Sequence, residues 1–165
     1  MYNERAIWIT GILTFLMTSV LWIGVGTLIY HVLTRDPPNF EVMIEHPDSV
    51  TLNEEFVLVV KVKDPAGEPL NLGSIDFETG LLNGFEVLSV HPKPLSKQKI
   101  PNYTSYYFKT LKKSPSEFIF TLNLRARKVG EWAGDIDCCT PLENFVTHYT
   151  EISVVEPQPR KDQET

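Results

Sequence analysis

The stretch Phe56 to Gly67, FVLVVKVKDPAG, decides the fold that the sequence predicts for most of this chain. Every second residue from Phe56 to Val62 is apolar, so in an extended strand these side chains share one face. The other face begins apolar and ends in Lys61 and Lys63, after which Asp64-Pro65-Ala66-Gly67 turns the chain. This pattern is typical of a half-buried β-strand that ends in a tight turn.

Similar short runs fill the chain after residue 40, and Pro- and Gly-rich turns separate them. We expect strands at 40–46, 56–63, 74–78, 85–90, 104–110, 117–126, 130–138 and 145–155. No stretch in this region has a convincing helical period, so a mainly β, antiparallel sandwich is predicted, with a barrel as the alternative. The side chains expected to be buried are Phe56, Leu58, Val60, Phe118, Phe120 and Leu122.

A segment of another kind precedes the strands, because Ala6 to Leu33 contains no Lys, Arg, Asp or Glu. About 20 apolar residues are enough for a helix to cross the hydrocarbon core of a membrane. A signal-peptide core is shorter, about 7–15 residues, and ends at small residues, whereas this run ends in Tyr30-His31-Val32-Leu33. The sequence therefore predicts a single, uncleaved N-terminal transmembrane helix, anchored in a lipid bilayer.

The whole chain then divides into consecutive parts. They are a cytoplasmic tail at 1–5, a transmembrane helix at 6–33, a linker at 34–39, the sandwich at 40–155 and a polar tail at 156–165. Arg5 and the free amine favour a cytoplasmic N-terminus. We therefore expect a cell-membrane protein whose C-terminal domain is extracytoplasmic, either periplasmic or extracellular. Because the linker is short and holds Pro37-Pro38, this domain is expected close to the membrane surface.

Three runs of the sandwich region resemble a known group of domains. They are PDSVTLNEEFVLVVKVKDPAGEPLNLGSIDF (47–77), GFEVLSV (84–90) and EFIFTLNLRARKVGEWAGDID (117–137). Together they resemble membrane-anchored bacterial extracytoplasmic immunoglobulin-like domains, in which an N-E-E-F strand leads into a D/N-P-x-G-x-P turn. The resemblance covers roughly residues 40–155 and implies an immunoglobulin-like sandwich. It carries over no catalytic residue, because this fold hosts many functions.

The composition excludes some partners. When Glu4, Arg5 and Arg35 are set aside, 13 basic and 20 acidic residues remain, nearly all of them in the sandwich region. An acidic domain argues against nucleic acid and anionic lipid headgroups as partners. The sequence contains no nucleophile elbow, phosphate-binding glycine loop or HExxH motif. We therefore expect no enzymatic activity, no cofactor and no metal.

The two cysteines, Cys138 and Cys139, are the most unusual pair in the sequence. Neighbouring side chains of a strand point to opposite faces, so one thiol is expected in the core and the other outside. Some respiratory-complex assembly factors have a similar layout, with one N-terminal span and an immunoglobulin-like domain. The copper-delivering ones carry Cys-x-Cys, in which both sulfur atoms reach one face, and this chain departs from that pattern. A thiol site at this pair is therefore a secondary hypothesis.

Two further sets of residues are candidates for contacts with a partner. Gly11, Thr14, Thr18 and Val25 share one side of the predicted helix, and small or hydroxyl residues let membrane helices pack closely. Lys93, Lys97 and Lys99 lie in 91–102, which holds three Pro and three Lys without an acidic residue and is expected to be an irregular loop.

Asp135 and Asp137 lie two apart on one strand face, and Tyr103, Tyr106, Tyr107 and Phe108 form an aromatic run. We interpret the carboxylates as a solvated edge and the aromatic run as core.

These observations support three hypotheses of function. The first is a non-catalytic accessory or stabilising subunit of a larger integral-membrane complex, docked through its helix and covering an extracytoplasmic surface with its sandwich. The second is an assembly factor for a respiratory-type complex that handles copper or redox equivalents through Cys138 and Cys139. The third is a cell-surface receptor or adhesin.

Overall fold

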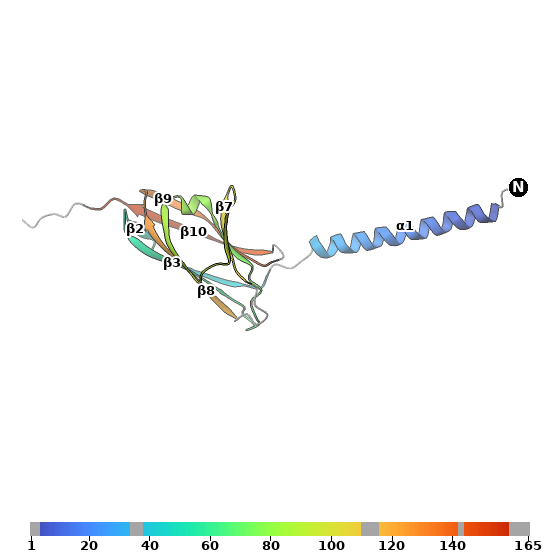
Figure 1. The fold of residues 1–165 in the computed structure, drawn as a ribbon, viewed down its shortest axis with the longest axis horizontal. Coiled ribbons are helices and arrows are strands. Elements are labelled where there is room, and N and C mark those ends of the chain that lie inside the picture. Colours follow the sequence, from blue (N-terminus) through green and yellow to red (C-terminus); the bar gives the residue numbers. More distant parts are fainter. Residues whose placement is uncertain (1–3, 34–37, 110–115, 142–143, 159–165) are drawn as a thin grey trace, which may run out of the picture. The chain divides into compact units, whose positions relative to one another are not determined.

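The computed structural model describes residues 4–33, 38–109, 116–141 and 144–158 (Figure 1). The chain divides into two compact units, Met1–Asp36 and Pro37–Thr165. The first unit contains the long helix α1, and the second contains the β-domain. Each unit is described by itself below.

Helix α1 runs from Glu4 to Leu33 and so begins two residues before the predicted span. Its side chains are described at residues 13–27, 29 and 30, where apolar groups as large as Phe15 and Trp22 are exposed. These apolar side chains are spread around the helix and do not form a single apolar face. Within the described residues, no helix is both long enough and apolar enough to cross a membrane. The helix predicted over residues 6–33 is thus confirmed, whereas its crossing of a membrane is not supported by this part of the chain.

The β-domain consists of two sheets that enclose one core (Figure 1). The four-stranded sheet has the order β1-β3-β8-β5, with bounds Glu41–Glu45, Glu55–Lys63, Glu117–Ala126 and Phe85–His91. The six-stranded sheet has the order β2-β10-β9-β4-β7-β6, with bounds Ser49–Thr51, Phe145–Val155, Gly130–Cys139, Ser74–Glu78, Tyr103–Tyr107 and Ser96–Lys99. A single helical turn, α2 (Thr79–Leu82), follows β4.

The pairing of the strands gives an immunoglobulin-like β-sandwich. The four-stranded sheet matches the A-B-E-D sheet of such domains, and β10-β9-β4 matches their G-F-C sheet. In this chain β5, in the D position, precedes β6 and β7, which extend the other sheet beside β4. The mainly β, immunoglobulin-like prediction is therefore confirmed. The expectation of purely antiparallel sheets is wrong at one place, because β2 pairs in parallel with β10.

The core follows from the alternation along β3 and β8. Leu58, Val60, Phe120 and Leu122 are fully buried, and Phe56 is 8% exposed, as predicted. Phe118 is only partly buried, since it lies near the start of β8 and packs edge-on against Phe108 with the ring centroids 4.8 Å apart.

Three short elements differ from the prediction. Strand β2 and helix α2 lay outside every predicted element. The stretch 91–102 is not one irregular loop, because β6 forms within it and pairs antiparallel with β7. Because β6 has only four residues, its side chains show no alternating pattern from which the strand could be predicted. Its backbone pairing with β7 defines it as a strand.

The outer face of the four-stranded sheet carries cross-strand ion pairs. Lys61 lies 2.5 Å from Glu45 and Lys63 lies 3.7 Å from Glu41, across β1 and β3. Glu86 pairs with Arg127 at 2.5 Å and with Arg125 at 3.5 Å, and Arg125 also pairs with Glu55. Acidic and basic side chains of this face therefore neutralise one another.

Candidate functional site: an acidic hollow on the six-stranded sheet

The register of the six-stranded sheet brings polar side chains from five strands into one row. Asp76 of β4 lies opposite Asp137 of β9 on one side and opposite Ser105 of β7 on the other. The row continues to Thr147 of β10 and Gln98 of β6. Side chains of residues paired in this way lie on the same face. Since their sequence neighbours Ile75, Ile136 and Tyr106 are in the core, this row lies on the outer face of the sheet.

A second row lies two residues away on the same face. Ser74 of β4 is opposite Cys139 of β9 and Tyr107 of β7, and Cys139 is opposite Phe145 of β10. Beyond the other side of the first row, Tyr103 of β7 lies opposite Glu78 of β4. Carboxylates thus occupy the centre of the face, and aromatic rings lie on both sides of them.

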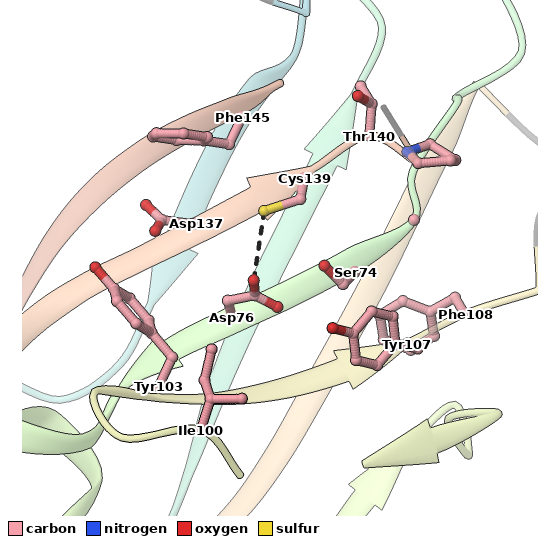
Figure 2. A pocket seen from close by; sticks show the side chains of 12 residues that line it. Ser74, Asp76, Ile100, Tyr103, Tyr107, Phe108, Asp137, Cys139, Thr140 and Phe145 are labelled. Atoms are coloured by element: carbon pink, nitrogen blue, oxygen red, sulfur yellow. Dashed lines mark hydrogen bonds between the residues drawn. The ribbon is translucent and has the colours of Figure 1, made fainter. Parts of the chain in front are cut away.

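These rows surround a hollow of about 740 Å³, which we call the acidic hollow. Its principal lining side chains are Asp76, Asp137, Cys139, Tyr103, Tyr107 and Phe145. Figure 2 shows the Asp76 carboxyl group pointing from β4 toward the Cys139 sulfur on β9, and the Sγ–Oδ2 distance is 3.6 Å. Neither Lys nor Arg is among the described residues that line it. A volume of about 300–1,000 Å³ is usual for a site that takes a small molecule.

Two buried oxygen atoms at this row have no hydrogen-bond partner in the described part of the chain. They are Oδ1 of Asp76 and Oγ of Ser105, which belong to directly opposed residues. Ser105 is 1% exposed and lies between Tyr103 and Tyr107 on β7, both of which line the hollow. Buried polar atoms normally have partners, and an unpaired one is unfavourable by about 1–3 kcal/mol. Asp76 lines the hollow, so its Oδ1 can accept a hydrogen bond from a group that enters it, whereas Ser105 is not among the lining residues.

Two groups that line the hollow, the Asp137 carboxyl and the Tyr103 phenol, have raised pKa values. Burial raises the pKa of the Asp137 carboxyl, and the charges of nearby carboxylates raise it further, while a hydrogen bond from Thr147 Oγ1 (2.6 Å) lowers it. Burial also raises the pKa of the Tyr103 phenol, as do the charges of four acidic groups. These groups are Asp137, Glu78, Asp135 and Asp76. The Tyr103 phenol therefore lies within electrostatic reach of the whole set.

The cysteines lie on opposite faces of β9, as predicted. Cys138 is fully buried in the core, whereas Cys139 is partly exposed in the acidic hollow, and both are free thiols. Burial raises the pKa of each thiol to about 12, and the charge of Asp76 contributes at Cys139. Two sulfur atoms on opposite faces do not converge on one metal, and a raised pKa suppresses the reactive thiolate. Among the described residues, no group of three or more His, Cys, Asp or Glu side chains is arranged to hold a metal ion.

The other predicted contact residues lie on α1 and around β6, and none of the three lysines near β6 lines the hollow. Thr14, Thr18 and Val25 are exposed along α1, while the surroundings of Gly11 lie outside the described residues. The Thr18 hydroxyl donates to its own helix, at 3.0 Å from Thr14 O and 2.9 Å from Phe15 O. Lys93, Lys97 and Lys99 are exposed at β6 and the loop before it, and Lys97 Nζ lies 5.3 Å from the centroid of the Tyr106 ring.

Sequence reasoning missed the centre of this site. It interpreted Asp135 and Asp137 as a solvated edge, but Asp137 lines a hollow. It interpreted the aromatic run as core, which holds for the buried ring of Tyr106, whereas Tyr103 and Tyr107 face the hollow. The available signal was the polar alternation of β4, SIDFE, in which Asp76 and Glu78 share the outer face.

Comparisons with known proteins assign neither a family nor a function to this chain. No family model and no curated protein matches the chain. Among solved structures, it is similar to a cohesin module from a Clostridium perfringens family 33 glycoside hydrolase, at 11% identity, TM-score 0.44, over 72% of this chain and 98% of that one. It is similar to a CARDB domain from Pyrococcus furiosus at 18% identity, TM-score 0.43, over 75% and 99%. It is also similar to a superoxide reductase from Ignicoccus hospitalis at 19% identity, TM-score 0.37, over 72% and 82%. Likenesses at this level transfer no activity.

Proposed function

We propose that this chain is a non-catalytic, single-pass membrane protein whose β-sandwich binds a partner protein. In this proposal it is an accessory or stabilising subunit of a larger integral-membrane complex. The N-terminus is cytoplasmic and the sandwich covers an extracytoplasmic surface of that complex. The observation that carries the proposal is that large apolar side chains are exposed around α1, at the described positions 13–27, 29 and 30, without forming a single apolar face.

The surface of α1 supports burial in lipid or against other helices. Side chains such as Phe15, Met17 and Trp22 are highly exposed, at 71%, 70% and 72%. Large apolar surfaces of this kind are normally covered, and a helix that is apolar all round is typical of a buried or membrane-spanning one. At 1.5 Å per residue, a charge-free segment such as 6–33 is about 42 Å long, against about 30 Å for a hydrocarbon core. The proposal of a span rests on this sequence, part of which lies outside the described side chains.

The β-domain supports a binding role over a catalytic one. Its acidic hollow offers carboxylates, phenols and a thiol, but the pKa of the Cys139 thiol is raised to about 12 and that of the Tyr103 phenol is raised as well. The thiolate is the nucleophilic form of a cysteine, and a raised pKa suppresses it. The same observation weakens the thiol-based assembly hypothesis relative to the accessory-subunit hypothesis.

The test is purification of the full chain with an affinity tag after Thr165. The proposal expects the chain in the membrane fraction, resistant to extraction at high pH, and recovery of one integral-membrane complex in mild detergent. A variant that lacks residues 1–36 serves as the control and should be recovered in the soluble fraction. Recovery of the full chain in the soluble fraction, or from membranes without any partner, contradicts the proposal.

A further inference from the structure

We propose that the acidic hollow binds an arginine side chain of the partner protein, with the guanidinium group between the carboxylates of Asp76 and Asp137. This inference rests on the proposed function, since it names the chemical group by which the partner is recognised. It is carried by the geometry and the charge of the outer face of the six-stranded sheet.

The first argument is the contrast between the two outer faces of the domain. On the four-stranded sheet, the cross-strand ion pairs to Lys61, Lys63, Arg125 and Arg127 neutralise Glu41, Glu45, Glu55 and Glu86. On the six-stranded sheet, no ion pair to a basic side chain is found for Asp76, Glu78, Asp135 or Asp137 among the described residues. Because like charges at opposed positions destabilise a sheet, the second face is complementary to a cation from outside.

The second argument is the unused hydrogen-bonding capacity of Asp76, which lines the hollow. Within the described chain, its Oδ1 atom is buried without a hydrogen-bond partner. Asp76 lies directly opposite Asp137, which also lines the hollow. A guanidinium group carries five N–H donors in a planar fork and therefore can satisfy several acceptors at once.

The third argument is the aromatic wall, which favours arginine over a compact ammonium group. Tyr103 and Tyr107 of β7 and Phe145 of β10 line the hollow on either side of the carboxylates (Figure 2). Guanidinium groups stack on aromatic faces and are more weakly hydrated than an ammonium group, so they enter such a site at a smaller desolvation penalty. The occupant that fits carboxylates, phenols and a nearby ring together is an arginine side chain.

The experiment is a titration of the full chain, in detergent, with N-acetyl-arginine amide as the probe. Amide NMR shifts of residues 74–78, 103–107 and 135–139 report on the hollow. We expect saturable shifts in these residues and at least a roughly tenfold loss of affinity in the double variant D76N/D137N, because it removes both charged acceptors of the guanidinium hydrogen bonds. The matched control is E41Q/E45Q, which removes two carboxylates from the other sheet and should bind the probe as the wild type does.

Further probes separate this inference from its alternatives. N-acetyl-citrulline amide has nearly the same shape without the charge and is expected to cause no saturable shift. Equal affinity for citrulline, equal affinity for N-acetyl-lysine amide, a shift pattern reproduced by calcium chloride, or unchanged arginine binding in D76N/D137N would each overturn it. A further outcome is that the variant D76N/D137N no longer binds the probe and yet still co-purifies with the partner complex from membranes. That result would exclude recognition of the partner through an arginine in the hollow, while the proposed function would stand.

Discussion

Asp76 and Asp137 lie directly opposite each other on the adjacent strands β4 and β9, with both carboxylates on the outer face of the sheet. Like charges at opposed positions of a β-sheet are destabilising. A hydrogen bond from Thr147 partly compensates at Asp137, yet the pKa of this carboxyl remains raised. The fold therefore holds together two groups that repel each other, which is typical of a surface shaped for a ligand at some loss of stability.

The variant Asp137→Asn should stabilise the domain at neutral pH. The substitution removes a partly buried charge and keeps an oxygen that can accept the Thr147 hydrogen bond. Because the pKa of Asp137 is higher in the folded than in the unfolded chain, its ionisation penalty is absent below the unfolded pKa and develops as the pH rises through the folded pKa. Urea midpoints of the wild type and the variant should differ at about pH 7 and converge at about pH 3.

Glu131 provides the matched control for this prediction. It lies on the same strand but is exposed, so Glu131→Gln should change the urea midpoint little at either pH. A lower midpoint for Asp137→Asn than for the wild type at neutral pH would contradict the electrostatic account.

The core can be tested at neighbouring positions of one strand. Leu58 is fully buried between the sheets, whereas Val57 is 44% exposed on the opposite face of β3. Leu58→Ala should destabilise the fold by roughly 2–5 kcal/mol, because it removes apolar contacts and leaves a cavity. Val57→Ala should change the free energy of unfolding by less than about 1 kcal/mol. Equal effects of the two substitutions in urea unfolding would place the sandwich core elsewhere.

The strand faces could be predicted from the sequence because alternation is a local property. Each apolar residue of β3 or β8 indicates its own side of the strand, and the predicted set from Phe56 to Leu122 is buried except for the half-buried Phe118. The acidic hollow could not be predicted in this way. Asp76 and Cys139 are 63 residues apart, and their contact depends on the pairing of β4 with β9, which no local pattern specifies. A slip of one residue in that pairing would turn the carboxylates to the other face.

The thiols should be almost unreactive in the folded chain. Burial and the charge of Asp76 raise the pKa of Cys139 to about 12 from its ordinary 9.0. At about pH 8 the thiolate fraction is then roughly a thousandfold smaller, and alkylation should slow to a similar extent. Mass spectrometry after iodoacetamide treatment should find Cys139 protected in native buffer and modified in urea. Asp76→Asn should speed its modification, because one of the charges that raise the pKa is gone.

The same two cysteines should be dispensable for binding the partner. A Cys138→Ala/Cys139→Ala variant should recover the same membrane complex, with a small loss of stability at the buried position 138. Stoichiometric copper that co-purifies with the wild type and is absent from this variant would contradict the prediction. That result would favour the assembly-factor hypothesis.

The last prediction concerns the face of α1 that holds Gly11, Thr14 and Thr18. If this face packs against a partner helix, Gly11→Leu with Thr18→Leu should keep membrane insertion, since leucine is at least as apolar, but should abolish recovery of the partner in mild detergent. The physical reason is bulk and not a lost interhelical hydrogen bond, because the Thr18 hydroxyl already donates to Thr14 O and Phe15 O of its own helix. Partner recovery, measured by mass spectrometry from membranes, is the readout.

Leucine at Phe15 and Ile29 is the matched control for the helix. Both side chains are exposed, at 71% and 51%, and both lie away from the centre of the Gly and Thr face. A leucine at either position adds no bulk, so close packing at the proposed face is unaffected and the partner should be recovered as in the wild type. If Gly11→Leu with Thr18→Leu also leaves recovery unchanged, α1 has no packed face and serves as a plain anchor. Such an anchor would tolerate the substitutions because lipid solvates leucine as well as glycine.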